Sequence, residues 1–206
     1  MACVRPGLRT LPGSLFLLPL LLASFPVLAE ETPPLRDVDR IRIAEAFRLA
    51  DEVQDKLWPG WSKAPFALDL VTNEFEFLLR HPNPPADFER IGEDVQLGGA
   101  IFARKRTQRT DLLATFPING VPTIVVGQAE HTLAETSTKW VITLLHEHFH
   151  QLQYSQADYQ EAVDRLGLSR GDTSGMWMLN YEFPYKDTEV QRRFEELCRT
   201  LSAAVS

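Results

Sequence analysis

Residues 140–153 read Trp140-Val-Ile-Thr-Leu-Leu-His146-Glu147-His148-Phe149-His150-Gln-Leu-Gln, and the rest of the fold is inferred outward from this stretch. On an α-helix, at 100° per residue, His146 and His150 project from one face one turn apart, with Glu147 beside them. The opposite face is apolar and is formed by Val141, Leu144, Leu145 and Leu152. The stretch therefore predicts an amphipathic helix with one face of polar, potentially metal-binding side chains and one buried apolar face.

The spacing of the two histidines on this helix predicts a zinc site. Imidazoles at positions i and i+4 bind one Zn²⁺ at about 2.0–2.1 Å and leave room for a third ligand and a water. We expect His146 and His150 to be the metal ligands. The ion lowers the pKa of its water toward about 7 and polarises a carbonyl oxygen. Glu147 is then placed to act as the general base, which predicts peptide-bond hydrolysis.

A bare H-E-x-x-H pattern also arises by chance, so its context matters. Three of the five histidines of the chain fall within residues 146–150, and residues 140–145 carry no charge. Both features favour a metal site over a chance helix. His148 projects about 160° away from the zinc pair, and we expect it to be a packing or surface residue instead of a ligand.

The segment from His146 to His150, with Thr143 and Leu144 before it and Leu152 after it, resembles the zincin metallopeptidases. The metzincin branch would require Gly at position 153 and His at position 156. This chain has Gln at both positions, so what remains is similar to the gluzincin type.

The resemblance implies an α+β fold, a small mixed sheet packed on the active-site helix with additional helices. It also implies an edge strand that pairs with extended peptide, for which we expect Val121–Gly127. The third zinc ligand would be a Glu on a later helix. Glu182 is a candidate, although Pro184 disfavours helical geometry at the preceding residue, Phe183. Alternatively, that ligand lies beyond Ser206, in which case the domain in residues 30–206 is incomplete.

Hydrophobic periodicity predicts the other elements. An amphipathic helix is expected over residues 38–57, followed by strands at 66–71 and 75–79. A further strand pair is expected at 99–107 and 121–127, with Asn119-Gly120 as the turn before the second strand.

Thr132 and Glu135 have the spacing of a capping box for the histidine helix, as do Asp158 and Glu161 for a short helix over residues 158–166. A last amphipathic helix is expected from Thr188 to Ser206. Glu161 and Asp164 are expected on a solvated surface.

Composition indicates one ordinary globular domain. The chain has 206 residues, 44% hydrophobic and 24% charged, and a net charge of −7. The charge becomes −9 without the first 29 residues, because Arg5 and Arg9 lie there. An acidic chain is a poor candidate for binding nucleic acid, so we expect the basic run Arg104-Lys105-Arg106 and Arg109 to form a solvated face.

Residues 1–29 have the pattern of a signal peptide. Arg5 and Arg9 provide the positive end, residues 15–28 the apolar stretch, and Val27-Leu28-Ala29 a small-residue cleavage site. The mature domain would then be residues 30–206, exported to the periplasm or secreted, without stable membrane insertion. Cys198 would be the single cysteine left, so we expect no disulfide within the mature chain.

Two functions are consistent with these patterns. The first is an exported zinc-dependent metallopeptidase that acts on peptide or protein substrates, with Glu147 as the general base. The second is a catalytically silent, zincin-like binding or scaffolding protein of the cell envelope. A complete zinc coordination sphere with an open position would favour the first, and a missing third ligand would favour the second.

Overall fold

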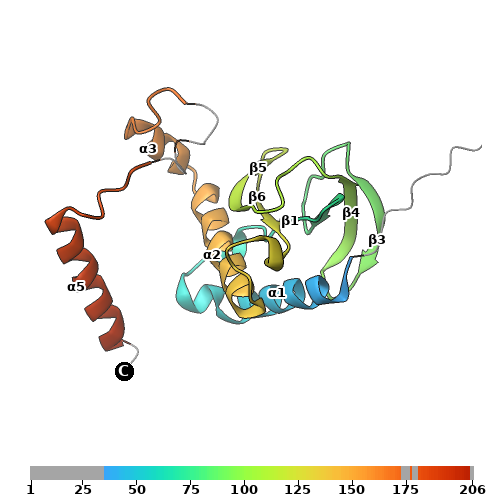
Figure 1. The fold of residues 1–206 in the computed structure, drawn as a ribbon, viewed down its shortest axis with the longest axis horizontal. Helices are drawn as coiled ribbons and strands as arrows, with labels where there is room; N and C mark the ends of the chain where they lie inside the picture. The colour runs from blue at the N-terminus through green and yellow to red at the C-terminus, as the bar shows by residue number, and fades with distance from the viewer. Residues whose placement is uncertain (1–34, 173–176, 178–180, 205–206) are drawn as a thin grey trace, which may run out of the picture. The chain divides into compact units, whose positions relative to one another are not determined.

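The computed structural model describes residues 35–172, 177 and 181–204 (Figure 1). The signal peptide predicted for residues 1–29 lies outside them. In chain order the elements are α1 (Asp37–Leu57), the 3₁₀ turn η1 (Trp61–Lys63), β1 (Leu68–Val71), β2 (Phe75–Leu79), β3 (Glu89–Asp94), β4 (Gly99–Lys105), β5 (Leu113–Ile118), β6 (Val121–Gly127), η2 (Ala129–His131), α2 (Ser137–Ser155), α3 (Tyr159–Arg165) and α5 (Thr188–Ala204).

The six strands form one mixed sheet in the order β3-β4-β2-β1-β6-β5. All neighbouring strands are antiparallel except β1 and β6, which run parallel. The α+β class with a mixed sheet is therefore confirmed. Strands β3 and β5 are the two edges of the sheet.

The predicted edge strand is wrong in its position. Val121–Gly127 lies inside the sheet between β1 and β5, and the edge beside it is β5, Leu113–Ile118. The predicted pairing of strands 99–107 and 121–127 is also wrong, because β4 pairs with β2 and β3. The sequence analysis predicts no strand at Leu113–Ile118. Pro117 weakens the strand pattern of this segment, yet an edge strand tolerates a proline.

The turn between β5 and β6 is formed by Asn119 and Gly120, as the sequence predicts. Both residues have positive φ, 45° and 78°, the combination required by a two-residue type I′ hairpin turn. Ile118 and Val121 face each other on either side of it. The turn therefore sets the register of the whole β5–β6 hairpin.

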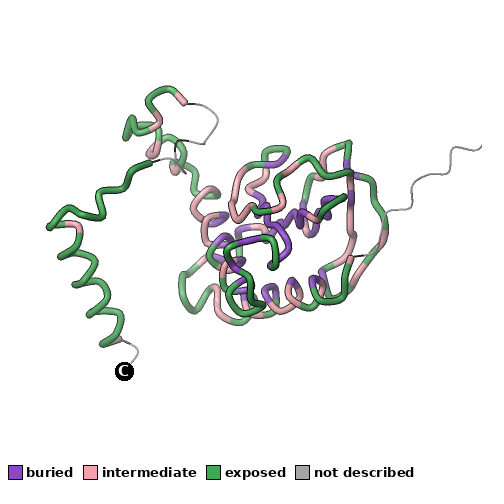
Figure 2. Tube along the Cα trace, viewed as in Figure 1, coloured by how far each residue is buried: buried purple, intermediate pink, exposed green. Residues whose placement is uncertain are grey.

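Helices α1 and α2 pack on one face of the sheet, where they enclose the main core (Figures 1 and 2). Trp140 on α2 is fully buried, and its indole N–H donates to the Gly127 carbonyl at 2.9 Å. The core is made of the inward side chains of the strands and of the two helices. They include Ile43, Phe47, Leu68, Leu70, Phe77, Ile124, Val126, Trp140 and Leu144.

The start of α2 differs from the predicted capping box. The helix begins at Ser137, and the Thr136 hydroxyl accepts a hydrogen bond from the Lys139 N–H at 3.3 Å. Thr132 instead bonds within the preceding turn, to the Ala129 carbonyl and the Ala134 N–H. The predicted cap of the short helix is wrong too, because Asp158 makes no side-chain cap bond at the start of α3.

The last predicted helix is present as α5. It starts after Asp187, whose carboxylate accepts hydrogen bonds from the N–H groups of Glu189 and Val190. None of the helices in the described ranges is both long and apolar enough to cross a membrane.

The basic run is not a solvated face at Arg104. Its guanidinium is mostly buried and forms ion pairs with the carboxylates of Glu76 at 2.6 Å and Asp87 at 2.7 Å. The first of these carboxylates is fully buried and also accepts from the N–H groups of Thr107 and Gln108. Arg104 therefore neutralises a buried acid inside the sheet.

A second buried acid, Asp69 on β1, has no such partner. It is 0% exposed, and within the described part of the chain neither carboxylate oxygen has a hydrogen bond. Its neighbours across the sheet are Leu78 and Val125. Burial, and secondly the charge of Glu76, raise the pKa of Asp69 well above its usual range.

Asp69→Asn is expected to stabilise the protein at pH 8. In the folded wild type Asp69 holds its proton to a higher pH than in the unfolded chain, so stability falls as pH rises from the unfolded pKa to the folded one. The amide removes that loss, and we expect a gain of about 1–3 kcal/mol at pH 8 and none near pH 3. Urea unfolding at both pH values measures it, and equal stability changes at the two would contradict it.

Candidate metal centre

Helix α2 carries the candidate site, and its packing decides which side chains face outward. The buried residues of the helix include Trp140, Leu144 and Gln151. With these positions held against the core, His146 is exposed and His150 is half-buried on the other side. A ligand in solution can therefore reach the two imidazoles.

The two imidazoles point their Nε2 atoms at each other. These atoms are 3.1 Å apart, and the rings are nearly perpendicular, at 87°. Two nitrogens bound tetrahedrally to one zinc ion at 2.0–2.1 Å would be about 3.3 Å apart, so the observed separation fits that ion. One potential ligand atom from each of His146, Glu147 and His150 lies within 4.8 Å of the others. The structure thus brings together the three residues that the sequence singled out.

Gln153 orients His150. Its side-chain Oε1 lies 2.6 Å from Nδ1 of His150, and because an amide oxygen only accepts, this contact favours the tautomer with its proton on Nδ1. In that tautomer the lone pair is on Nε2, which faces His146. Polar partners of this kind fix the tautomer of metal-binding histidines. In the sequence alone, Gln153 stands out only as a departure from the metzincin pattern.

Glu147 is held against strand β5. It is 6% exposed, and the Thr115 hydroxyl lies 2.8 Å from its Oε2 atom and 3.0 Å from its backbone carbonyl. Thr115 lies in the middle of the edge strand. The sequence interpretation missed this contact because it did not recognise β5 as a strand.

His148 is a packing residue, as predicted. It is 1% exposed, stacks on Phe66 with ring centroids 4.1 Å apart, and has ring nitrogens within hydrogen-bond distance of Gln54 and Gln151. Burial lowers the pKa of His148 to about 4. It stays neutral within the core and is not part of the pair formed by His146 and His150.

The structure does not bring the predicted third ligand to the site. Glu182 is exposed in a segment without regular secondary structure, and it is not part of the group formed by His146, Glu147 and His150. Glu161 and Asp164 lie on the exposed surface of α3, bonded to Arg165 and Gln160, as expected. Across the described ranges, no other His, Cys, Asp or Glu side chain joins the histidine pair.

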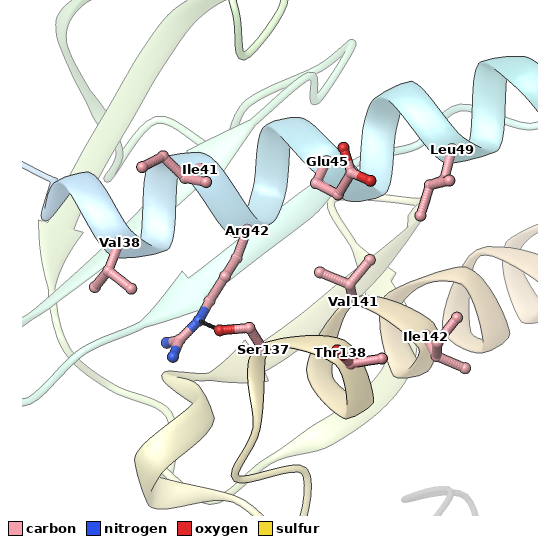
Figure 3. Close-up of a pocket in the computed structure, with 9 residues that line it drawn as sticks. All are labelled: Val38, Ile41, Arg42, Glu45, Leu49, Ser137, Thr138, Val141 and Ile142. Atoms are coloured by element: carbon pink, nitrogen blue, oxygen red, sulfur yellow. Dashed lines mark hydrogen bonds between the residues drawn. The ribbon is translucent and has the colours of Figure 1, made fainter.

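Two hollows flank helix α2. A groove of ≈ 410 Å³ lies between α1 and the first turns of α2; it is mainly apolar, and its Arg42 guanidinium is bonded to Ser137 (Figure 3). The second hollow, of ≈ 310 Å³, lies between β5 and α2. It begins one helical turn before Glu147 and is lined by Leu113, Leu133, Ala134, Lys139, Ile142 and Thr143. The second hollow therefore adjoins the candidate site.

Comparisons with known proteins identify no relative. No protein-family model matches the chain, and no curated protein or solved structure matches it either. Any functional assignment must therefore come from the geometry of the site.

His148 is expected to make folding stability fall in mild acid. Its folded pKa of about 4 is below its unfolded value of about 6.5, so the unfolded chain alone gains the proton as pH falls through this window. The loss is about 3 kcal/mol at most. Denaturant unfolding from pH 7 to pH 4 should show this slope reduced in His148→Gln. The exposed His131→Gln is the control, and an unchanged slope in His148→Gln would contradict the prediction.

Proposed function

We propose that this protein is a zinc-dependent hydrolase that cleaves peptide bonds. The observation that carries the proposal is the pair of facing Nε2 atoms of His146 and His150, with the buried carboxylate of Glu147 beside them. Without a metal the two Nε2 atoms are at hydrogen-bond distance from each other, and Gln153 contacts the other nitrogen of His150. A zinc site gives each of these contacts a role.

In this proposal the side chains have separate tasks. His146 and His150 hold the metal, which when bound supplies an activated water and a positive charge for the substrate carbonyl oxygen. Glu147 accepts the proton of the attacking water on a carboxylate oxygen. It then donates this proton to the nitrogen of the leaving amine, so that the peptide C–N bond breaks as the new C–O bond remains.

The free edge of β5 is the expected place for the substrate backbone. An extended peptide can add itself to an exposed strand edge through main-chain hydrogen bonds. Strand β5 is an edge of the sheet, and its residue Thr115 contacts Glu147. A peptide paired with β5 would therefore run past the general base.

The hollow beside β5 suggests a preference for apolar side chains. Its lining includes Leu113, Leu133 and Ile142, and it begins one turn before Glu147. A substrate side chain next to the cleaved bond would enter this hollow, where burial of apolar surface is favourable.

The alternative function is a catalytically silent, zincin-like binding or scaffolding protein. The observation in its favour is that, in the part of the chain that the structure describes, the histidine pair has no third protein ligand other than Glu147. Export to the cell envelope or beyond is part of both proposals and is supported by the sequence pattern of residues 1–29 alone.

Zinc analysis of the purified protein tests the site. We expect about one zinc per chain in the wild type and loss of most of it in His146→Ala and in His150→Ala, because one imidazole alone holds the ion weakly. Glu147→Gln should retain zinc and lose about 10²-fold or more in kcat on a peptide library, since it removes the base.

His131→Gln is the control for these variants, because it removes an exposed histidine outside the group. Absence of zinc from the folded wild type at neutral pH would overturn the metallopeptidase proposal. Zinc binding without any hydrolysis that depends on Glu147 would instead favour the silent alternative.

Leu133→Asp tests the substrate preference. Leu133 lines the hollow, yet it is 93% exposed, so the substitution leaves the core intact. For peptides with an apolar residue at the cleavage site we expect KM to rise about three- to tenfold with kcat unchanged. Leu166→Asp, at an exposed leucine outside the hollow, is the matched control. Equal KM values in the two variants would show that the hollow does not bind the substrate.

A further inference from the structure

We propose that Thr115 is a positioning residue whose hydroxyl keeps the Glu147 carboxylate off the metal, so that Glu147 serves as a base and not as a ligand. This inference rests on the proposed function, because it concerns how the general base of the same site is kept free to act. It assigns a role to an edge-strand residue that belongs to no recognised motif.

The contact itself is short and enclosed. The Thr115 hydroxyl oxygen is 2.8 Å from Oε2 of Glu147, and Glu147 is 6% exposed. The hydroxyl has a single proton to donate, and a carboxylate is a stronger acceptor than the backbone carbonyl at 3.0 Å. With water largely excluded, a charge-assisted bond of this kind restrains the carboxylate strongly.

A restraint is needed because the carboxylate lies very near His146 and His150, the two proposed metal ligands. One of its oxygens is within 4.8 Å of the ligand nitrogens of His146 and His150. Carboxylate oxygens bind Zn²⁺ readily, at about 2.0–2.2 Å. A free Glu147 would therefore move onto the ion, and a carboxylate bound to the metal as a ligand can no longer take the proton of the water.

The fold holds Thr115 in place independently of the metal. Thr115 faces Ile124 of β6, a fully buried residue, in the register set by the Asn119-Gly120 turn. A slip of one residue would turn the hydroxyl to the opposite face of the sheet. The donor is therefore preorganised by the hairpin, and Glu147 is the group that adapts to it.

Each threonine variant that tests this role changes a single chemical group of the side chain. Thr115→Val keeps the shape of the side chain and removes the hydroxyl, and Thr115→Ser keeps the hydroxyl. Thr123→Val removes a hydroxyl from the neighbouring strand, where it bonds to the Val121 carbonyl and not to Glu147. Glu147→Gln, alone and combined with Thr115→Val, shows which effects pass through the carboxylate.

The first measurement uses metal-free protein labelled with ¹³C at the glutamate carboxyl carbon. The Glu147 resonance is assigned by its loss in Glu147→Gln. We expect it to move in Thr115→Val and to stay in place in Thr115→Ser and Thr123→Val. An unmoved resonance in Thr115→Val would overturn the proposal, whether or not the protein binds zinc or cleaves peptides.

The second measurement is zinc affinity by chelator competition, together with kcat and KM. Thr115→Val is expected to bind zinc about three- to tenfold more tightly while kcat falls about ten- to a hundredfold and KM stays within about twofold. The gain in affinity should vanish when Glu147→Gln is added, and Thr115→Ser should behave as the wild type.

A merely structural role would move zinc affinity in the other direction, so weaker zinc binding in Thr115→Val would overturn the proposal. Failure of the peptidase function is recognised separately. If the wild type cleaves no peptide, the proposed function fails, whereas the resonance and the zinc affinity still decide whether Thr115 restrains Glu147.

Discussion

The side-chain amide of Gln151 ties helix α2 to the sheet. Its Nε2 atom donates to the carbonyls of Ala67 and Pro122, both at 2.8 Å, just before strand β1 and at the start of β6. A buried amide that lost these acceptors would be costly, so the helix cannot rotate freely on the sheet. Trp140 adds a second bond near the other end of the helix, to Gly127. These two anchors direct the imidazoles outward.

The same anchoring separates two kinds of histidine on one helix. His148 lies on the side of the helix that packs inside, where burial keeps it neutral and Phe66 covers its ring. His146 and His150 lie on the outer side, with their Nε2 atoms 3.1 Å apart. Three histidines within five residues thus serve packing and the candidate metal site, and helical geometry alone decides which serves which.

Glu147 belongs to neither group completely. It is buried like the core residues, yet its carboxylate lies beside the histidine pair and bonds to Thr115 on the edge strand. A buried carboxylate requires a partner, and Asp69 shows what happens without one: burial raises its pKa well above the usual range. The site therefore depends on strand β5 as much as on helix α2.

Local patterns in the sequence were enough to predict the elements that they encode directly: the α2 and α1 helices, strands β1 and β2, and the Asn119-Gly120 turn, because periodicity and turn chemistry act over a few residues. The face of α2 that carries the imidazoles followed from the same rule. Strand β5 was missed because of Pro117, and β3 because its exposed, charged residues lack an apolar pattern. The strand order and the contacts of Thr115 and Gln151 with residues about 30 or more positions away were decided only by tertiary structure, since no local pattern records which distant segments pack together.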